Sequence, residues 1–564
     1  MIVWLGNNAK KLMVVMLSIM ICFVTTGYAG GKIPENIRIG LYFTRTAVSS
    51  VEISSQNGFK FGYERDGAFI AIWEEPSLQR VTVRKDSYYA VTPEGMIEYS
   101  PNAPTIPAGK KYGPYHVQIG QDYDNYDDAR QQLENLKQKG LSVYPAFYDG
   151  FYKIWTGAYT STQEAEKALG AIKETSSQDA RVIIPGAVRI QVVNSHNNQI
   201  IFMFDSTSWH LMMYPIAGKE GIPVIDVNGK LYRGAVEFKR FSDSDMTVIN
   251  YVDFEEYLYG VLPREMGANW PMEALKTQAV AARTFAMLHM NRYSDYGFNL
   301  CTTTTCQVYG GYSVERNTCT NAVEQTRGQV LTYQGAPAQV YYFATSGGHT
   351  ADVRNVWGGT GLPYLQGVED PYEDIEVAMR GIWEVSFIPA QIHQILQDRD
   401  IDVGQITSMY VSSYSKEGRA VELTIEGTHG QHTFERSNTR NIFGVNVVNS
   451  QKYVIQTDSD IHMMGQDTDS ISHALVSQLQ VLSASGTQTL NTTNNRIYAM
   501  GANTKKSYSV IPSIYHFNGR GWGHGVGLSQ WGARGMADEG FTHDQILPHY
   551  FPGTEIQQWG EVDN

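Results

Sequence analysis

The chain has 564 residues, so at about 150 residues per domain it is long enough for about three or four domains. Its hydrophobic content of 42% and aromatic content of 12% are typical of a globular protein and exclude a largely disordered chain. The formal net charge of −13 argues against nucleic acid as a partner.

The first 29 residues have the order of a secretory signal. Lys10 and Lys11 precede the apolar run LMVVMLSIMICFV, and the small residues of GYAG follow and end near Ala29. The apolar run is shorter than the roughly 20 residues that a membrane span needs. We therefore predict a signal peptide over residues 1–29 and an exported protein, with an uncleaved membrane anchor as the alternative. Losing the two lysines changes the net charge from −13 to −15.

Residues 30–112 are predicted to form a β-rich segment followed by a linker. The stretches IRIGLYF, SVEI and RVTVRK have the composition of short strands and are separated by turn residues. The linker is SPNAPTIPAGKKYGP, which is rich in Pro and Gly.

Residues 113–186 are predicted to form a small split βαβ domain. The strand YHVQIGQ precedes a helix in YDDARQQLENLKQKG, a hairpin turns at Asp149-Gly150, and a second helix in TSTQEAEKALGAIKE leads to the strand ARVIIPG. With VQIG opening one half and IWTGAY the other, the segment resembles the SPOR repeat. This resemblance implies binding to peptidoglycan, with a preference for glycan strands that lack stem peptides. The candidate glycan contacts are aromatic residues on the predicted sheet: Tyr144, Phe147, Tyr152 and Trp155, of which Tyr152 and Trp155 are predicted to bind.

Residues 187–564 are predicted to form a β-rich catalytic region with one prominent helix. Pro271 is predicted to lie in the first turn of that helix, which carries an apolar stripe of Leu275, Ala279, Ala282 and Ala286. Before it, GVLPREMGANWP is predicted to place Arg264 and Glu265 on a turn between a strand and the helix.

The stretch GRGWGHGVGLSQWGARGM, from Gly519 to Met536, is too rich in Gly for a regular helix over its first half. Gly permits a positive φ and a close approach of backbone to a neighbour, so we expect a loop packed around aromatic rings. Ser529 is predicted to cap a helix that runs through Trp531 and ends near Gly540. His524, alone among the glycines, is expected to hold the loop or to hydrogen-bond a ligand rather than to act as a base.

Several segments in one order resemble the sporulation stage II protein D (SpoIID) family, which includes amidase enhancers of the LytB type. They are EEYLYGVLPREM, ALKTQAVAARTFA, CQVYGG, YYFATSGGHTA, VWGG, PYLQGVEDP and GRGWGHGVGLSQWGARGMADEGFTHDQILPHYFPG. The resemblance implies a peptidoglycan lytic transglycosylase whose catalytic acid is Glu265. Arg264 stands where the family more often has serine. The resemblance also implies a substrate groove for which Tyr342, Ser346, Trp522, His524 and Gln530, with Arg264, are candidate contacts.

A single glutamate suits this chemistry. It protonates the departing glycosidic oxygen and then accepts the proton of the sugar's own 6-hydroxyl, which makes a 1,6-anhydro product. A general acid must hold its proton, so apolar neighbours such as Met266 and Trp270 are expected near Glu265. The other acids considered are Glu255 and Glu256, expected before a strand, Glu273 in the first helical turn, and Asp370 in a turn. A surface ion pair between Glu265 and Arg264 is the alternative without catalysis.

Metal and cofactor chemistry is not expected. Cys301 and Cys306 in CTTTTC can form a disulfide, remain free thiols or supply two metal ligands. Some SpoIID relatives carry zinc near this segment, but the matching histidines are absent here, and no H-E-x-x-H motif occurs. We predict an α+β, multidomain protein of the cell envelope whose partners are peptidoglycan glycan strands and a cell-wall amidase. The alternative function is a non-catalytic enhancer of an N-acetylmuramoyl-L-alanine amidase.

Overall fold

The structure is a computed structural model that describes residues 32–560 except 94, 243, 465–470, 477–478, 485, 490–495 and 501–503. The predicted signal peptide lies outside the described residues. The chain forms two compact units. The N-terminal unit comprises Ile33–Ala268 and Ala286–Arg327, and the C-terminal unit comprises Asn269–Phe285 and the chain from Gly328 onward.

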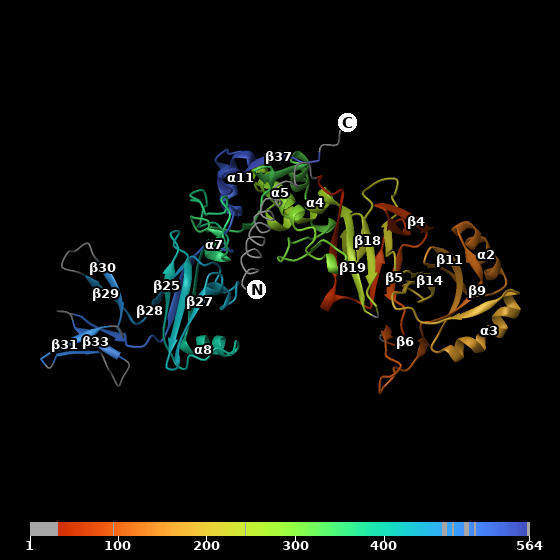
Figure 1. The fold of residues 1–564 in the computed structure, drawn as a ribbon, viewed down its shortest axis with the longest axis horizontal. Helices are drawn as coiled ribbons and strands as arrows, with labels where there is room; N and C mark the ends of the chain where they lie inside the picture. The colour runs from red at the N-terminus through yellow and green to blue at the C-terminus, as the bar shows by residue number, and fades with distance from the viewer. Residues whose placement is uncertain are drawn as a thin grey trace, which may run out of the picture. The chain divides into compact units, whose positions relative to one another are not determined.

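Two large sheets form most of the N-terminal unit (Figure 1). The seven-stranded sheet has the order β20-β1-β19-β18-β15-β3-β4. Its strands are β1 Asn36–Tyr42, β3 Phe59–Arg65, β4 Ala68–Glu75, β15 Leu211–Pro215, β18 Ala235–Arg240, β19 Met246–Asp253 and β20 Leu300–Cys301. A three-stranded sheet, β7-β6-β8, contains β6 Tyr89–Thr92, β7 Gly95–Glu98 and β8 Lys110–Tyr112, so the predicted linker includes one paired strand.

The ten-stranded sheet has the order β12-β9-β11-β10-β14-β13-β5-β2-β16-β17. Its strands are β2 Ser50–Ser54, β5 Arg80–Lys85, β9 Tyr115–Tyr123, β10 Val143–Tyr148, β11 Phe151–Tyr159, β12 Ala180–Ile183, β13 Ile190–Asn194, β14 Ile200–Asp205, β16 Ile225–Val227 and β17 Lys230–Tyr232. It therefore joins strands from the predicted N-terminal segment, the predicted SPOR-like domain and the start of the predicted catalytic region.

The split βαβ pattern predicted for residues 113–186 is confirmed. Helices α2 Tyr126–Gln138 and α3 Thr162–Ser176 pack on one face of β9, β11 and β10 (Figure 1). Asn125 and Ser161 cap the two helices with their side-chain oxygens, and the hairpin turns at Asp149 and Gly150, which both have positive φ. The apolar faces of both helices bury Leu133, Leu136 and Ile172 against the sheet.

The opposite face of these strands is also buried. There Tyr144, Ala146 and Trp155 form a core cluster with side chains of β13 and β14, and the Trp155 ring stacks on His116 at 5.6 Å between centroids. Trp155 is 1% exposed, and Tyr152, whose ring lies 5.8 Å from that of Tyr126 on α2, is 8% exposed. The expectation that Tyr152 and Trp155 contact glycan is therefore not met in this structure, because both rings belong to the core.

Among the described residues, the rest of the N-terminal unit contains two α-helices and three short 3-10 helices. They are α4 Phe254–Glu265, α6 Asn317–Gln325 and the 3-10 helices Thr44–Thr46, Ser294–Tyr296 and Tyr312–Val314. The predicted prominent helix is confirmed as α5 Met272–Leu288, most of which belongs to the C-terminal unit. It begins directly after Pro271, which the sequence predicts in its first turn.

The C-terminal unit consists of small sheets around a separate core. The sheets are β22-β21-β37, β23-β36, β24-β35-β28 and β25-β26-β27, together with short two-stranded hairpins. The strands are β21 Gln329–Tyr333, β22 Ala336–Pro337, β23 Tyr342–Phe343, β24 Ile382–Phe387, β25 Ile406–Tyr414, β26 Ala420–Gly427, β27 Gly430–Glu435, β28 Tyr453–Thr457, β29 Asp460–Met464, β30 Ile471–Leu475, β31 Gln480–Ser483, β32 Gly486–Thr489, β33 Arg496–Met500, β34 Lys505–Ser509, β35 Tyr515–Arg520, β36 Leu528–Ser529 and β37 Glu555–Gln558.

The C-terminal unit contains further helices in addition to α5. They are α7 Val353–Val356, α8 Pro389–Gln397, α9 Asn438–Asn441, α10 Gln530–Asp538 and α11 His543–Tyr550. The core under β24, β35 and β25–β27 is rich in aromatic residues, including Phe387, Phe443 and Phe517. The protein is an α+β, multidomain chain with more strand than helix, as predicted.

Candidate functional site

Glu265 is the last residue of α4 rather than part of a turn between a strand and a helix. Asp253 caps this helix: its Oδ1 accepts the backbone N–H groups of Glu255 at 2.9 Å and Glu256 at 3.0 Å. The cap starts the helix at Phe254, so the prediction that Glu255 and Glu256 precede a strand is also wrong. Pro263 lies in the last turn, and the helix ends two residues later.

The Glu265 carboxylate lies against the segment Cys301–Tyr309. The backbone N–H of Val308 donates to Glu265 Oε1 at 3.0 Å. The next residue back, Gln307, accepts the Tyr257 hydroxyl of α4 at 3.0 Å, which ties the segment to the helix. Glu265 is half-buried and Arg264 is exposed. The arrangement orients one carboxylate oxygen by a backbone donor and leaves the group within reach of solvent or a ligand.

Two cysteines lie in the same segment. Cys301 and Cys306 are buried free thiols whose Sγ atoms are 2.9 Å apart. The hydrogen bond from Cys306 lowers the pKa of Cys301 to about 5. In the part of the chain that the structure describes, no three His, Cys, Asp or Glu side chains gather in a way that would hold a metal ion.

In the C-terminal unit, the Gly-rich stretch forms a loop between β35 and β36. Its backbone pairs with the strand-like segment before the 346–348 turn, because Thr345 and Trp522 exchange N–H···O bonds of 3.1 and 3.0 Å. Ser529 Oγ accepts the N–H of Gly532 and caps α10, as predicted. This pairing brings the predicted residues Tyr342, Ser346, Trp522, His524 and Gln530 into one region of the unit.

His524 is held in an aromatic cluster. Its ring lies 5.5 Å from Phe343, 5.1 Å from Trp357 and 6.3 Å from Tyr341, measured between centroids. Burial, together with the guanidinium groups of Arg440 and Arg419, lowers the pKa of His524 to about 3. The ring is therefore neutral near pH 7, and its Nδ1 accepts the N–H of Val526 at 3.1 Å. These contacts suit a residue that holds the loop.

A pair of carboxyl groups supports the turn at residues 346–348. The Glu373 carboxylate accepts the backbone N–H groups of Ser346 and Gly347 and the Ser529 hydroxyl. Asp370, 1% exposed, accepts the Tyr550 hydroxyl at 2.8 Å. Burial and the neighbouring charge of Glu373 raise the pKa of Asp370 to about 7. The pair links the turn to the start of α10.

Glu273 is the ionised acid that the sequence predicts in the first turn of α5. Although burial favours the neutral form, hydrogen bonds from Lys276 and His543 lower the pKa of Glu273 to about 2. A carboxylate that stays ionised near neutral pH is a poor proton donor.

Two family models match parts of the chain. The family described as Stage II sporulation protein, SpoIID, matches residues 242–333, which include α4 and Glu265, and the SPOR domain matches residues 111–183. An uncharacterized protein of Brachyspira hyodysenteriae is 30% identical over 338 residues, which cover 60% of this chain and 75% of that protein. The chain belongs to the SpoIID/LytB family.

Two named SpoIID/LytB relatives come from Bacillus subtilis. Its "Amidase enhancer" is 31% identical over 349 residues, which cover 59% of this chain and 45% of the relative, so the match spans less than half of that protein. Its "Stage II sporulation protein D" is 27% identical over 328 residues, which cover 55% of this chain and 76% of the relative. Family membership associates the chain with the cell wall. None of the helices in the described part of the chain is long and apolar enough to span a bilayer.

The burial of the predicted groove residues divides them into two groups. Ser346, at 0% exposure, and Gln530, at 8%, are enclosed, and Ser346 Oγ accepts the N–H of Gly348. These two side chains are therefore buried parts of the structure that supports the loop. Tyr342 and Trp522 are half-buried, and the Arg380 guanidinium lies 4.8 Å from the Trp522 ring centroid.

Sequence reasoning missed three features of these regions. Tyr148, 40% exposed, and Phe151, 45% exposed, flank the predicted hairpin turn, and a hairpin tip is the sequence signal that could have found them. The Glu373 carboxylate accepts backbone N–H groups of the 346–348 turn, and the residues around Glu373 do not indicate this contact. Trp357 lies in the VWGG motif, which by itself predicts no role for the indole, although its ring contacts His524.

Proposed function

We propose that the protein is a peptidoglycan lytic transglycosylase with Glu265 as its catalytic acid and base. The observation that carries the proposal is the position of Glu265: its carboxylate is oriented by the Val308 N–H at the end of α4, within the segment that matches the SpoIID family. The substrate is the bond between N-acetylmuramic acid and N-acetylglucosamine in glycan strands that lack stem peptides.

In the proposed reaction, the protonated Glu265 donates to the departing glycosidic oxygen as the muramic acid ring gains oxocarbenium character. The 6-hydroxyl of the same sugar attacks the anomeric carbon, and the ionised Glu265 accepts the hydroxyl proton. The carboxyl group returns to its starting state, and the product has a 1,6-anhydro end. No second carboxylate is needed, because no water is activated.

Replacing Glu265 by Gln tests this proposal. The substitution keeps the shape and the Val308 contact but removes the transferable proton, so anhydro-product formation should fall by about 10²- to 10⁴-fold. The measurement is mass spectrometry of products from stripped glycan strands. Glu256→Gln, at the other end of α4, is the matched control and should retain most activity. Equal turnover by Glu265→Gln and the unaltered protein would rule out the assignment.

The second candidate function is a non-catalytic enhancer of a cell-wall amidase, and the similarity to the B. subtilis amidase enhancer favours it. The same assay separates the two functions. An enhancer yields no anhydro ends alone, but it increases the release of stem peptides when an amidase is added. Either function requires export, so we propose that residues 1–29 direct the chain out of the cytoplasm.

A further inference from the structure

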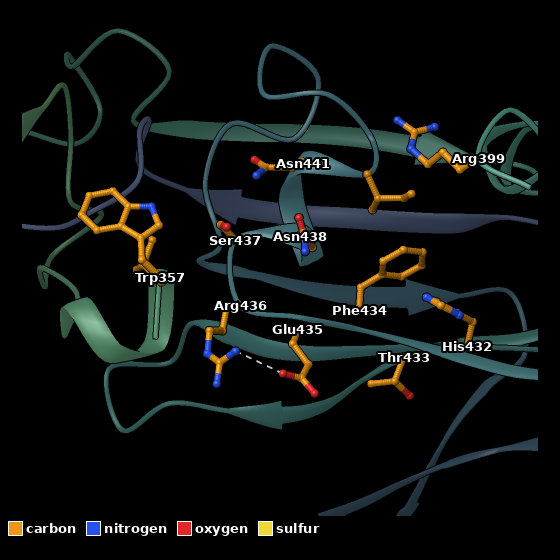
Figure 2. A pocket seen from close by; sticks show the side chains of 12 residues that line it. Trp357, Arg399, His432, Thr433, Phe434, Glu435, Arg436, Ser437, Asn438 and Asn441 are labelled. Atoms are coloured by element: carbon orange, nitrogen blue, oxygen red, sulfur yellow. Dashed lines mark hydrogen bonds and ion pairs between the residues drawn. The ribbon is translucent and has the colours of Figure 1, made fainter. Parts of the chain in front are cut away.

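A polar pocket of about 700 Å³ lies in the C-terminal unit, between the end of α7, strand β27 and helix α9. Figure 2 shows Trp357 at one end of the pocket and His432 and Arg399 at the other, with Arg436, Ser437, Asn438 and Asn441 between them. A volume of this size is in the range that holds a small ligand of one or two sugar rings. No side chain of this pocket was among the predicted site residues.

Trp357 is partly exposed and also packed against other rings. The residue is 44% exposed, and its ring centroid lies 4.6 Å from that of Tyr341 and 5.1 Å from that of His524. An exposed indole held in place by other rings loses little conformational freedom on binding. The apolar face of a pyranose ring is the common partner of such a surface in an otherwise polar pocket.

Arg436 is held beside this platform by the backbone. It has φ +54°, which is uncommon for a residue other than Gly, and the next N–H, of Ser437, donates to Val356 O at 3.1 Å. Its guanidinium lies over Gly358: a Cβ there would be 3.2 Å from Arg436 Nε. The Glu435 carboxylate is 3.3 Å from Arg436 Nη1, in a pair whose side chains are both about half exposed. The guanidinium is therefore positioned and still open to a ligand.

The remaining polar groups suit an acetamido sugar. Ser437, Asn438 and Asn441 offer hydroxyl and amide groups that can donate and accept. Arg436 and Arg399 outnumber the acid of the lining, Glu435, so the pocket favours a ligand with a negative charge.

We propose that this pocket binds an N-acetylated pyranose that carries a free carboxylate, with the ring stacked on Trp357 and the carboxylate paired with Arg436. In cell-wall glycan, this chemistry belongs to a muramic acid unit whose lactyl group has lost its stem peptide. The proposal rests on the proposed function for the choice of polymer, but the binding itself needs no cleavage. The pocket would therefore bind muramic acid without a stem peptide more tightly than muramic acid with one. An amide-linked lactyl group has no carboxylate to pair with the Arg436 guanidinium.

The test is binding rather than turnover. The full-length Glu265→Gln protein is titrated by calorimetry with two probes: a stripped tetrasaccharide of alternating N-acetylglucosamine and N-acetylmuramic acid, and chitotetraose, which has the acetamido groups but no carboxylate. Because this protein is not expected to cleave, the result does not depend on whether the proposed activity is correct.

Arg436→Gln should weaken binding of the muramic tetrasaccharide by about tenfold and that of chitotetraose by less than about twofold, since a charge-assisted hydrogen bond contributes more to binding than a neutral one. Trp357→Ala should weaken both by about tenfold, and Trp357→Phe should restore most of the affinity. Arg354→Gln, an exposed arginine on α7 outside the pocket, is the control and should bind like its parent. Unchanged affinities in folded Trp357→Ala and Arg436→Gln proteins would overturn the site. An equal loss for both probes in Arg436→Gln would overturn the carboxylate contact.

Discussion

At the scale of single residues, Asp370 has an unusual environment because its carboxyl group is buried next to a second one. It is buried beside Glu373, which supports the turn at Ser346 and Gly347 and also accepts the Ser529 hydroxyl. Two carboxylates cannot both be ionised in such a site without repulsion. A proton on Asp370 removes this repulsion and keeps the turn and the start of α10 together.

The raised pKa of Asp370 predicts that stability falls as the pH rises. In the unfolded chain Asp370 loses its proton near pH 4, whereas in the folded protein it keeps the proton up to about pH 7. Between these values the unfolded state binds fewer protons, so the free energy of unfolding should fall by up to about 1.4 kcal/mol per pH unit. Urea unfolding from pH 4 to 8 measures the slope. Asp370→Asn should flatten it, whereas Asp374→Asn, an exposed neighbour, should not.

Among the elements, the Gly-rich loop depends on close backbone contact. Gly525 has φ +84°, and its carbonyl accepts the N–H of Ala351. A Cβ at this position would lie 2.6 Å from Cζ of Arg419, a fully buried side chain that also bonds the carbonyl groups of Ser346 and His349. Any side chain at position 525 would therefore require the buried Arg419 guanidinium to shift.

Gly525→Ala should destabilise the C-terminal unit by about 2 to 4 kcal/mol, because it adds a steric clash to an unfavourable backbone conformation. Gly348→Ala is the matched control: Gly348 has φ +97°, but nothing lies within 4 Å of its Cβ position. That variant should lose only about 1 to 2 kcal/mol. Denaturant unfolding followed by tryptophan fluorescence compares the two, and equal losses would show that Arg419 moves aside freely.

The ten-stranded sheet contains a buried charged cluster where the SPOR-like strands meet the others. Asp86, after β5, accepts Arg189 Nη1 at 3.1 Å and Gln191 Nε2 at 2.5 Å, and lies 3.2 Å from His116 Nε2 on β9. Asp205 pairs with the same arginine at 2.8 Å. The cluster joins strands of different chain segments, and its members form hydrogen bonds and ion pairs with one another.

Asp86→Ala should cost about 3 to 5 kcal/mol, because it leaves buried partners without their acceptor. The measurement is the urea midpoint of the N-terminal unit, read by proteolysis at sites within it. Asp66→Ala, at the exposed β3–β4 turn, is the control and should change stability by less than about 1 kcal/mol. A comparable loss in both variants would contradict the role of the cluster.

At the scale of the whole molecule, the SPOR-like strands share one sheet with strands of other segments. This limits how glycan binding by the SPOR-like segment can be tested. Deleting Tyr115–Pro185 would remove the partner of β14 and expose the charged cluster, so loss of function would not separate binding from folding. The exposed aromatic residues at the hairpin tip, Tyr148 and Phe151, offer a milder change.

The double variant Tyr148→Ala, Phe151→Ala should bind intact sacculi several-fold more weakly and digest them more slowly. It should cleave short soluble glycans at nearly the unaltered rate, because these reach Glu265 by diffusion and gain nothing from a raised local concentration. Pelleting with sacculi measures binding, and product analysis gives the rates of cleavage of sacculi and of short soluble glycans. Ile184→Ala, which removes another exposed apolar side chain, is the control. Unchanged sacculus binding would show that glycan contacts another surface.

Local signals in the sequence predicted much of the molecule. The helices after Asn125 and Ser161, the turn at Asp149-Gly150 and the cap at Ser529 each depend on a few adjacent residues, so their chemistry is visible without the fold. The place of Glu265 followed from a motif. The turn expected there was wrong because Asp253, twelve residues earlier, starts a helix that the motif does not reveal.

The sequence by itself determined the α+β class, the split βαβ segment and the family, and it singled out Glu265 as the candidate acid of the proposed function. Only the tertiary structure decided that β10 pairs with β14, that Tyr152, Trp155 and Ser346 are buried, and that Trp357 and Arg436 line one pocket. The physical reason is range. Caps, turns and periodicity act over a few residues, whereas burial and strand pairing depend on partners tens of residues away, which no local pattern specifies.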